Sequence, residues 1–337
     1  MTAVIPVLLF HGKGRNGERY LLPLAPCGGT NPLRRFAPAL PKGEPFALSV
    51  KPFGFASSPG GRAKSVEGTL LAFLLKGNAS RSDVLLCFGG GVIGDMGGFA
   101  ASVYMRGINF IAMPTTLIGM TDSSVGGKTG VDFCGVKNAV GSFHAPVLVV
   151  CCTDFLKTLP LRELHSGIGE IIKYAVIGGD SILNLLQGGI INNAALISAC
   201  CEIKRKFVEE DEFDNGTRRI LNLGHTFGHV FEAASGFSLS HGEAVGLGLA
   251  AAADFGEKLG FTKRGIAQKI ISLLREQGLK TNYAPYCTET AAELLLHDKK
   301  GDRSGIDMVF IKEFGHVFTH RVSTESAIAF LNSFCVF

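Results

Sequence analysis

Three residues of this chain belong to types that bind zinc, and each lies in a dense local motif. Glu170 lies in GEIIKY, His225 in GHTFGH and His241 in SHGEAVG. A lone histidine is more often a core or surface residue than a ligand, but two His-Gly motifs this close together favour a metal site. Two imidazoles and one carboxylate can form a catalytic metal site with one open coordination position. Such a site could hold and polarise a substrate hydroxyl.

The spacing around these residues adds two ionisable groups. Lys173 follows Glu170 by three residues, and His229 follows His225 by four. On helices, residues three or four apart share a face. Each helix is therefore predicted to supply one metal ligand and one further ionisable group to the same cavity.

A glycine-rich segment lies upstream. The apolar run 84–88 leads into the sequence GGGVIGD, residues 89–95, which predicts a strand, a tight loop and the start of a helix. Glycines let backbone N–H groups approach a pyrophosphate, and a helix N-terminus favours anions. The pattern GGGxxGD differs from the usual GxGxxG, so it indicates a nucleotide site outside the ordinary Rossmann dehydrogenases.

Length and composition limit the classes of protein. The chain has 337 residues, of which 46% are hydrophobic and 18% charged, so two domains with sizeable cores are expected. The net charge of +4 is mild, and no basic run with interleaved aromatics appears, so we predict no nucleic-acid partner. A positively charged cleft for an anionic substrate is a sufficient explanation of this charge.

Cysteine usage and hydropathy bear on the compartment. The nine cysteines are odd in number, include the adjacent pairs Cys151-Cys152 and Cys200-Cys201, and form no CxxC motif. This pattern suits buried reduced thiols and a cytoplasmic protein. No segment reaches the roughly 18 apolar residues that span a bilayer, and the N-terminus does not resemble a signal peptide, so no membrane association is expected.

The order of predicted elements indicates two kinds of domain. Up to residue 158, strands (84–88, 110–113, 147–151) alternate with helices (65–75 and one ending at Tyr104), with a glycine-rich loop over 122–138, as in a layered α/β domain. From residue 159 to 337 the chain is predicted to be helical, with apolar spacing in 194–208, 244–259 and 266–276. The ligand trio lies in the second domain and the glycine loop in the first, so we expect the active site in the cleft between them.

Together with the segments 114–116 (PTT), 122–130 (DSSVGGKTG) and 135–138 (GVKN), these motifs resemble the 3-dehydroquinate synthases. The resemblance extends from about Lys64 to Gly315. It implies a Rossmann-like α/β domain followed by a helical metal-binding domain. The implied reaction converts 3-deoxy-D-arabino-heptulosonate 7-phosphate to 3-dehydroquinate and phosphate in the shikimate pathway, which leads to chorismate and the aromatic amino acids. In this family bound NAD oxidises a hydroxyl, phosphate is eliminated, the hydride returns, and an aldol step closes the ring.

The resemblance also implies roles for individual residues. Glu170, His225 and His241 would bind one Zn²⁺ or Co²⁺, while Lys173 and His229 would lie at the reacting centre. The residues near the substrate carboxylate would be Lys204, Arg218 and Asn222. Those near the phosphate would be Lys128, Asn138 and one of Lys299 or Lys300. Arg106 matches an arginine that reaches across the family's dimer interface, so a homodimer is expected.

For NAD, the resemblance implies a pyrophosphate turn with further contacts along the first domain. The turn and the contacts together comprise Lys64, Gly90, Gly91, Val92, Asp95, Thr115, Thr116, Asp122, Ser123, Lys128, Lys137 and Thr158. The hydroxyls of Thr115 and Thr116 could equally bond to backbone at a strand end. The segment 60–64 departs from the family, because it keeps Lys64 but has Gly61 where the family has a glutamate. This departure predicts weaker NAD binding rather than a different reaction.

Three other functions compete with this interpretation. A valiolone or inosose synthase of the same superfamily acts on substrates without a carboxylate, so the trio Lys204, Arg218 and Asn222 argues against it. A metal-dependent polyol or alcohol dehydrogenase shares a GGG loop but lacks the KTG and GKN-like cluster. An inactive homologue that only binds metal and nucleotide is supported by the altered segment 60–64 alone.

Overall fold

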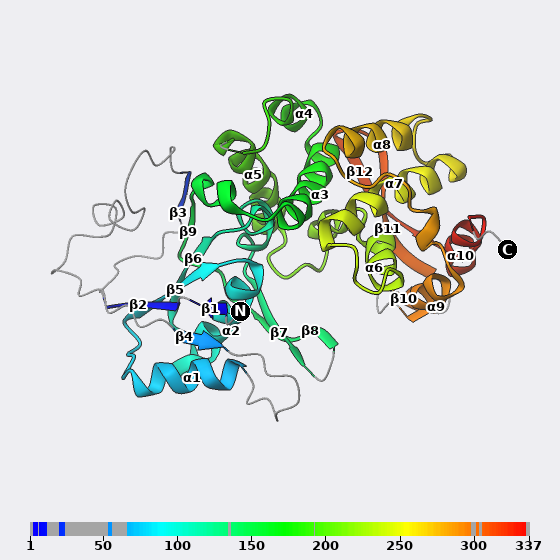
Figure 1. The fold of residues 1–337 in the computed structure, drawn as a ribbon. Coiled ribbons are helices and arrows are strands. Elements are labelled where there is room, and N and C mark those ends of the chain that lie inside the picture. Colours follow the sequence, from blue (N-terminus) through cyan, green and yellow to red (C-terminus); the bar gives the residue numbers. More distant parts are fainter. Residues whose placement is uncertain are drawn as a thin grey trace. The chain divides into compact units, whose positions relative to one another are not determined.

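The computed structural model describes most of the chain from residue 66 onward and four short strands before it. The described residues are 3–5, 7–11, 20–23, 53–55, 66–133, 136–191, 193–297, 301–302 and 305–334. The chain divides into two compact units, residues 1–158 and residues 159–337 (Figure 1).

A five-stranded sheet organises the first unit. Its strands in spatial order are β2 (Val7–His11), β5 (Asp83–Gly89), β6 (Asn109–Pro114), β9 (Leu148–Cys151) and β3 (Tyr20–Pro23). Strands β5, β6, β9 and β3 pair in parallel, and β2 pairs antiparallel with β5. Parallel strands are usually covered on both faces, which explains why β5, β6 and β9 are apolar runs. The predicted strands 84–88, 110–113 and 147–151 are confirmed.

Two helices accompany this sheet, α1 (Val66–Lys76) and α2 (Gly91–Val103). Both were predicted from the sequence. A separate strand pair joins β1 (Ala3–Ile5) to β4 (Phe53–Phe55). The glycine loop lies between β5 and α2, so the strand, loop and helix follow one another as predicted.

The prediction of one loop over 122–138 is wrong. After a short helical turn (Gly119–Ser123), the chain forms an antiparallel hairpin of β7 (Lys128–Phe133) and β8 (Val136–Phe143). One of the glycines that suggested a loop, Gly130, instead permits close strand pairing, because a Cβ there would lie 2.9 Å from the carbonyl oxygen of Val140.

The second unit is helical, as predicted. Its helices are α3 (Leu161–Gly178), α4 (Asp180–Leu186), α5 (Ala194–Glu210), α6 (His225–Ala234), α7 (His241–Leu259), α8 (Ile266–Glu276), α9 (Glu289–His297) and α10 (Thr324–Asn332). Rings from α6, α7 and α10 pack together, with Phe227 and Phe330 centred 5.4 Å apart and Phe255 and Phe330 5.0 Å apart. This aromatic core anchors α6 and α7 to each other.

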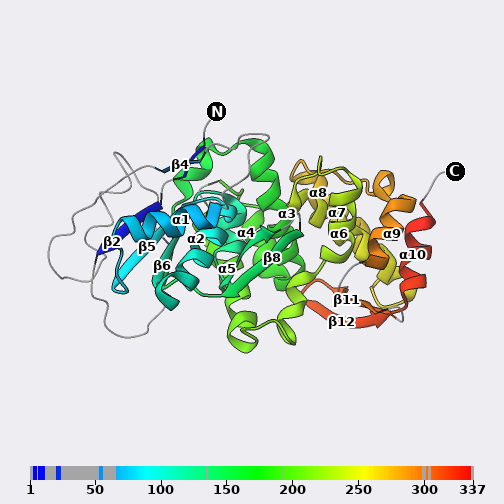
Figure 2. The same cartoon turned by 90° about the horizontal axis from the view of Figure 1, so that it is seen from below.

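An antiparallel sheet that the sequence analysis did not predict completes the second unit. It contains β10 (Gly301–Asp302), β11 (Gly305–Glu313) and β12 (His316–Val322). Figure 2 shows β11 and β12 side by side along one edge of this unit. Phe310 of β11 is fully buried and its ring lies 6.0 Å from that of Phe255, so the sheet covers α7.

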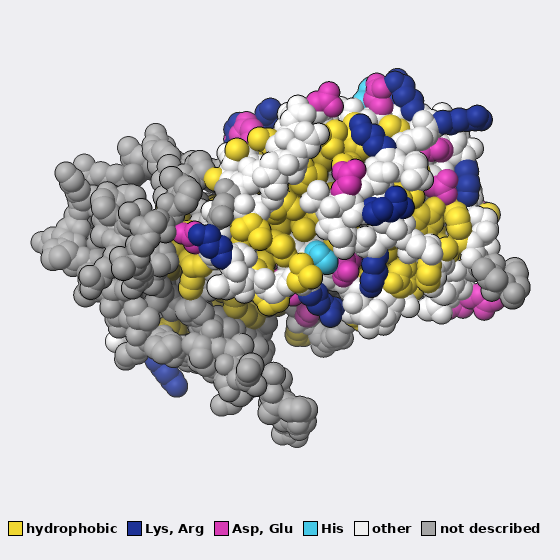
Figure 3. Space-filling view, turned by 45° about the horizontal axis from the view of Figure 1, so that its top comes forward, with side chains coloured by type: hydrophobic (Ala, Val, Ile, Leu, Met, Phe, Trp, Pro, Cys, Tyr) yellow, Lys and Arg dark blue, Asp and Glu magenta, His cyan; other side chains and the backbone are white. Residues whose placement is uncertain are grey.

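The described helices include none with the length and apolar composition of a membrane span. On the face drawn in Figure 3, basic and acidic side chains are interspersed over the described surface. This pattern agrees with the mild net charge.

Candidate active site

Close packing of α3 against α7 places Glu170 beside His241. A Cβ at Gly242 would overlap the carbonyl oxygen of Ser166, and a Cβ at Gly169 would overlap the backbone of Gly242. Only glycine at both positions allows the two helices to approach this closely. Glu170, the next residue on α3, is consequently fully buried against the N-terminus of α7.

The two histidine ligands occupy the first positions of their helices. Gly224, in a left-handed conformation with φ of 79°, precedes His225 and begins α6. Ser240 and Glu243 form a capping box that fixes the start of α7 at His241. A helix start with a defined cap holds its first side chain in a fixed direction, so both imidazoles are positioned by local structure.

The three predicted ligands come together in space. Oε1 of Glu170 lies 3.1 Å from Nε2 of His241 and 3.5 Å from Nε2 of His225. One ligand atom from each residue can be chosen so that all lie within 4.8 Å of one another. Donor atoms of a tetrahedral zinc ion are about 3.4 Å apart, given zinc–nitrogen bonds of about 2.0 Å. The donor types and separations therefore fit a divalent metal.

Neighbouring groups fix the orientation of the Glu170 carboxylate and of the His225 ring. Nζ of Lys173 lies 2.5 Å from Oε2 of Glu170, which leaves Oε1 toward the histidines. Nδ1 of His225 lies 3.2 Å from the carbonyl oxygen of Leu223. When Nδ1 donates to this carbonyl, the Nε2 lone pair is free for a metal.

His241 has a comparable partner on the adjacent helix. Nδ1 of His241 lies 3.5 Å from Oε2 of Glu232, which belongs to α6. Pairs of a carboxylate and a metal-binding histidine are common in metal sites, where they fix the ring orientation and raise ligand basicity. The sequence analysis missed Glu232, although its position seven residues after His225 on one helix predicts the same face.

Burial and these contacts shift the pKa values of Glu170, His225 and His241. Burial acts to raise the pKa of the Glu170 carboxyl, but Lys173 and the histidines hold that pKa well below its usual range. Burial lowers the pKa of His225. For His241, burial acts in the same direction, but Glu170 and Glu232 raise its pKa to about 9. Glu170 is thus a carboxylate at neutral pH, as a metal ligand must be.

His229 joins the cluster from the next turn of α6. Its ring centre lies 5.4 Å from that of His225 and 5.9 Å from that of His241. Unlike the ligand pair, His229 is exposed. An exposed imidazole beside a metal site can exchange protons with a bound substrate.

The residues predicted to bind the substrate carboxylate lie close to these histidines along the chain. Lys204 is buried on α5, while Arg218 and Asn222 belong to the 3₁₀ segment η5 (Thr217–Asn222). Arg218 is only 2% exposed. Segment η5 packs on α5 and leads through Leu223 directly into His225.

The glycine loop of the first unit fits a pyrophosphate. A Cβ at Gly90 would lie 3.1 Å from Cγ2 of Thr116, and one at Gly91 would lie 3.3 Å from Oγ of Ser123. No side chain caps α2, whose N-cap residue is Gly90. The structure therefore places Gly90, Gly91, Thr116 and Ser123 together at a helix N-terminus, where an anion is stabilised.

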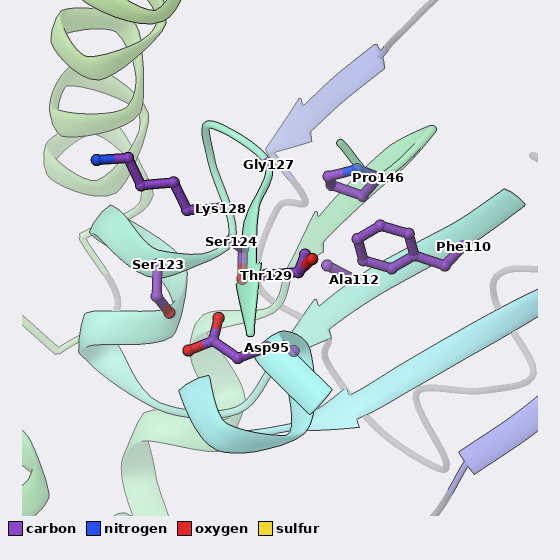
Figure 4. A pocket seen from close by; sticks show the side chains of 10 residues that line it. Asp95, Phe110, Ala112, Ser123, Ser124, Gly127, Lys128, Thr129 and Pro146 are labelled. Atoms are coloured by element: carbon purple, nitrogen blue, oxygen red, sulfur yellow. The ribbon is translucent and has the colours of Figure 1, made fainter. Parts of the chain in front are cut away.

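A pocket lies beside this loop (Figure 4). Asp95, Ser123 and Lys128 line it, together with Phe110 and Thr129. In Figure 4 the side chains of Asp95 and Ser123 face each other, while Lys128 points away from Thr129. Three residues predicted to contact the cofactor thus share one pocket.

The other described residues that were predicted to contact NAD lie at separate places in the first unit. Thr115 follows β6, and its N–H donates to the carbonyl oxygen of Gly89. Asp122 belongs to the turn before the hairpin, and Val92 is exposed in α2. Thr158 is exposed at the end of the first unit, where its hydroxyl lies 3.4 Å from the carbonyl oxygen of Phe155.

Two predicted residues have a positive φ, which is uncommon for residues other than glycine. Arg106 has a φ of 68° in the turn after α2, and Asn138 has a φ of 50° in β8. Such conformations concentrate at functional sites. The backbone of Lys137 lies in β8, whereas Lys64, Lys299 and Lys300 are outside the described residues.

Comparison with known families gives two adjacent matches. The profile described as "3-dehydroquinate synthase N-terminal" matches residues 56–166, and that described as "3-dehydroquinate synthase C-terminal" matches residues 167–301. The 3-dehydroquinate synthase of Streptococcus suis strain 05ZYH33 is 42% identical over 267 residues, which cover 77% of this chain and 75% of that protein. The Streptococcus mutans synthase is 39% identical over 296 residues, covering 86% and 83% respectively.

Solved structures of similar fold include two cyclases. A 2-epi-5-epi-valiolone synthase from Streptomyces hygroscopicus subsp. jinggangensis 5008, with NAD⁺ and Zn²⁺ bound, aligns with a TM-score of 0.69 at 26% identity, covering 80% of this chain and 78% of the other. A 2-deoxy-scyllo-inosose synthase complexed with carbaglucose-6-phosphate, NAD⁺ and Co²⁺ aligns with a TM-score of 0.71 at 23% identity, covering 81% and 79%.

Proposed function

The chain belongs to the 3-dehydroquinate synthase family, and we propose that it performs the family reaction with the residues described above. It is an enzyme with 3-dehydroquinate synthase activity, which converts 3-deoxy-D-arabino-heptulosonate 7-phosphate to 3-dehydroquinate and phosphate. One observation supports the site assignment most strongly. Glu170, His225 and His241 come from three separate helices and converge with metal-site spacing.

We assign NAD and the divalent metal to different units. Residues 159–337 would bind the divalent metal through Glu170, His225 and His241, and residues 1–158 would bind NAD at the loop of Gly90 and Gly91. When bound, NAD would supply reversible hydride transfer, and the metal would supply Lewis-acid stabilisation of negative charge on a substrate oxygen. The bound NAD⁺ and Zn²⁺ of the valiolone synthase support this assignment.

The protein's own side chains then bind and orient the substrate. Lys204, Arg218 and Asn222 would hold the carboxylate by charge and hydrogen bonds, with Arg218 offering a planar, bidentate donor. The phosphate would contact Lys128, Asn138 and one of Lys299 or Lys300. Together these groups would hold the substrate by its two anionic ends.

Lys173 and His229 would play different parts at the reacting centre. Lys173 keeps Oε2 of Glu170 paired, so that Oε1 stays directed at the metal position. His229 is exposed within the histidine cluster, and one of its ring nitrogens would accept a proton from the substrate and release it later.

The hairpin of the first unit supports a homodimer. Phe133, Val136, Val140 and Phe143 are all exposed, with exposures from 38% to 59%. Several large exposed apolar side chains on one hairpin are of the kind found at protein interfaces. A second copy of this chain would cover them, and Arg106 would act at this interface.

Buried thiols support a cytoplasmic location. Within the described part of the chain, the cysteines at positions 87, 151, 152, 200, 201 and 287 are buried. Burial raises the pKa of Cys87 to about 12, so this thiol is unreactive. Reduced structural thiols are typical of reducing compartments.

A substrate comparison tests the assignment against other cyclases. Phosphate release would be measured with 3-deoxy-D-arabino-heptulosonate 7-phosphate and with a heptulose 7-phosphate that lacks the carboxylate. The expected result is release from the acid alone in wild type. Preferential turnover of the neutral sugar phosphate would reject the carboxylate assignment and favour a valiolone-type synthase.

A further inference from the structure

The loop that joins α5 to η5 is organised by one carboxylate. Oδ1 of Asp211 accepts a hydrogen bond from the N–H of Asn215 at 2.9 Å. Oδ2 accepts from the N–H of Gly216 at 2.7 Å and from that of Arg218 at 3.1 Å. Hydrogen bonds to a charged acceptor are about twice as strong as neutral ones. The loop backbone is therefore folded around Asp211.

Asp211 also belongs to the end of α5. Its N–H donates to the carbonyl oxygen of Phe207 at 3.0 Å, which closes the last turn of the helix. Lys204 lies on the same helix, one turn before Phe207. Asp211 thereby links the helix that bears Lys204 to the segment that bears Arg218 and Asn222.

The guanidinium of Arg218 is fixed by the same loop. Its Nη1 donates to the carbonyl oxygen of Glu212 at 2.6 Å, and the residue is 2% exposed. The carbonyl belongs to the residue that follows Asp211. The backbone N–H and the side chain of Arg218 are consequently both held by adjacent residues at the start of the loop.

The carboxyl group of Asp211 carries a negative charge. Backbone hydrogen bonds, chiefly from Asn215, together with the charge of Arg218, hold the pKa of Asp211 below its usual range. The carboxylate is consequently ionised at the pH at which the enzyme works. Its negative charge also favours the Arg218 cation.

We propose that Asp211 is a positioning residue that holds Arg218 in the direction needed to bind the substrate carboxylate. This inference rests on the proposed role of Arg218. Asp211 itself does not contact substrate in this account. Its effect is specific to substrate affinity, because the metal ligands lie on other helices.

A double-mutant cycle tests the inference. Asp211→Asn, Arg218→Ala and the double variant would be compared with Glu210→Gln, which removes an exposed charge one residue away. Asp211→Asn should raise the substrate KM about tenfold, as expected for weakened charged hydrogen bonds, with kcat nearly unchanged. In the Arg218→Ala background the same substitution should add little, and Glu210→Gln should leave KM unchanged.

Two failures can be told apart. If Arg218→Ala leaves KM unchanged, the proposed role of Arg218 is wrong and the inference is overturned with it. If Arg218→Ala raises KM but Asp211→Asn does not, or if the two effects simply multiply, only the role of Asp211 is overturned. Thermal unfolding and metal content would be measured on every variant. Asp211→Ser, which keeps one short acceptor, replaces Asp211→Asn if that variant does not fold.

Discussion

Glu170 is the most constrained residue of the site. It is fully buried and faces an ammonium group and two imidazoles. A buried charge is tolerated only with such partners, because removal of one leaves an uncompensated ion. The same arrangement keeps the carboxylate ionised and directed toward the metal position.

Replacement of Glu232 by Gln should weaken metal binding. The amide keeps the size of the side chain but removes the negative charge beside Nδ1 of His241. Loss of such a partner typically lowers metal affinity by about 10- to 100-fold. Competition with a coloured chelator would measure the zinc dissociation constant, with Glu163→Gln on α3 as the control. Equal affinities for both variants would rule out this role of Glu232.

The types of the ligand residues could be predicted from the sequence, but the contacts around them could not. Glu170, His225 and His241 stand out because few other residues offer zinc-binding groups in such dense motifs. Glu232 and Asp211 are ordinary acidic residues of a helix and a loop in the sequence. Their roles depend on packing between segments, which residue type and local spacing do not specify.

At the scale of elements, the crossing of α3 and α7 sets the site geometry. The backbones meet at Ser166, Gly169 and Gly242, with no room for a side chain. Glu170 is adjacent to Gly169 and His241 is adjacent to Gly242. Any separation of the two helices therefore changes the distance between these two predicted ligands.

Replacement of Gly242 by Ala should therefore disturb both stability and metal binding. The added methyl group overlaps the Ser166 carbonyl, and overpacking of this kind costs about 3 kcal/mol or more because backbone must move. Thermal unfolding and zinc content would be measured. Gly188→Ala is the control, since its Cβ would lie 3.4 Å from the nearest atom, the carbonyl oxygen of Leu185. A Gly242→Ala protein as stable as this control would contradict the packing argument.

Elements with strong local signals were predicted, and those with non-local pairing were not. The buried strands β5, β6 and β9 and the amphipathic helices follow from apolar periodicity. The segment 122–138 predicts a loop from the sequence because glycines such as Gly130 resemble turn residues. Gly130 is instead required where the two strands approach closely, and this requirement appears only once the pairing is known.

At the scale of the whole molecule, the chain combines a glycine loop proposed to bind NAD in one unit with a Glu/His/His trio proposed to bind a metal in the other. Each part has local sequence signals, so both could be predicted. The proposed contacts with a second copy have no comparable signal, because exposed apolar residues are scattered throughout ordinary sequences.

Charge on the exposed hairpin should disrupt the proposed dimer. Phe143→Glu places a carboxylate in the apolar surface of β7 and β8, where burial against a partner would be costly. Sedimentation velocity should show a dimer for wild type and a monomer for this variant. Phe237→Glu, at a position that is 67% exposed in the second unit, is the matched control and should remain dimeric. A wild-type monomer would reject the dimer, and a dimeric Phe143→Glu variant would reject this surface.

The most direct test of the assigned chemistry is phosphate release from 3-deoxy-D-arabino-heptulosonate 7-phosphate by purified, zinc-loaded protein, with and without added NAD. Release that depends on NAD, without net accumulation of NADH, is the predicted result, because the cofactor is reduced and reoxidised within one turnover. Protein stripped of endogenous nucleotide and assayed at several NAD concentrations would also show whether Gly61 weakens binding. Absence of phosphate release at saturating NAD and zinc would contradict the assignment.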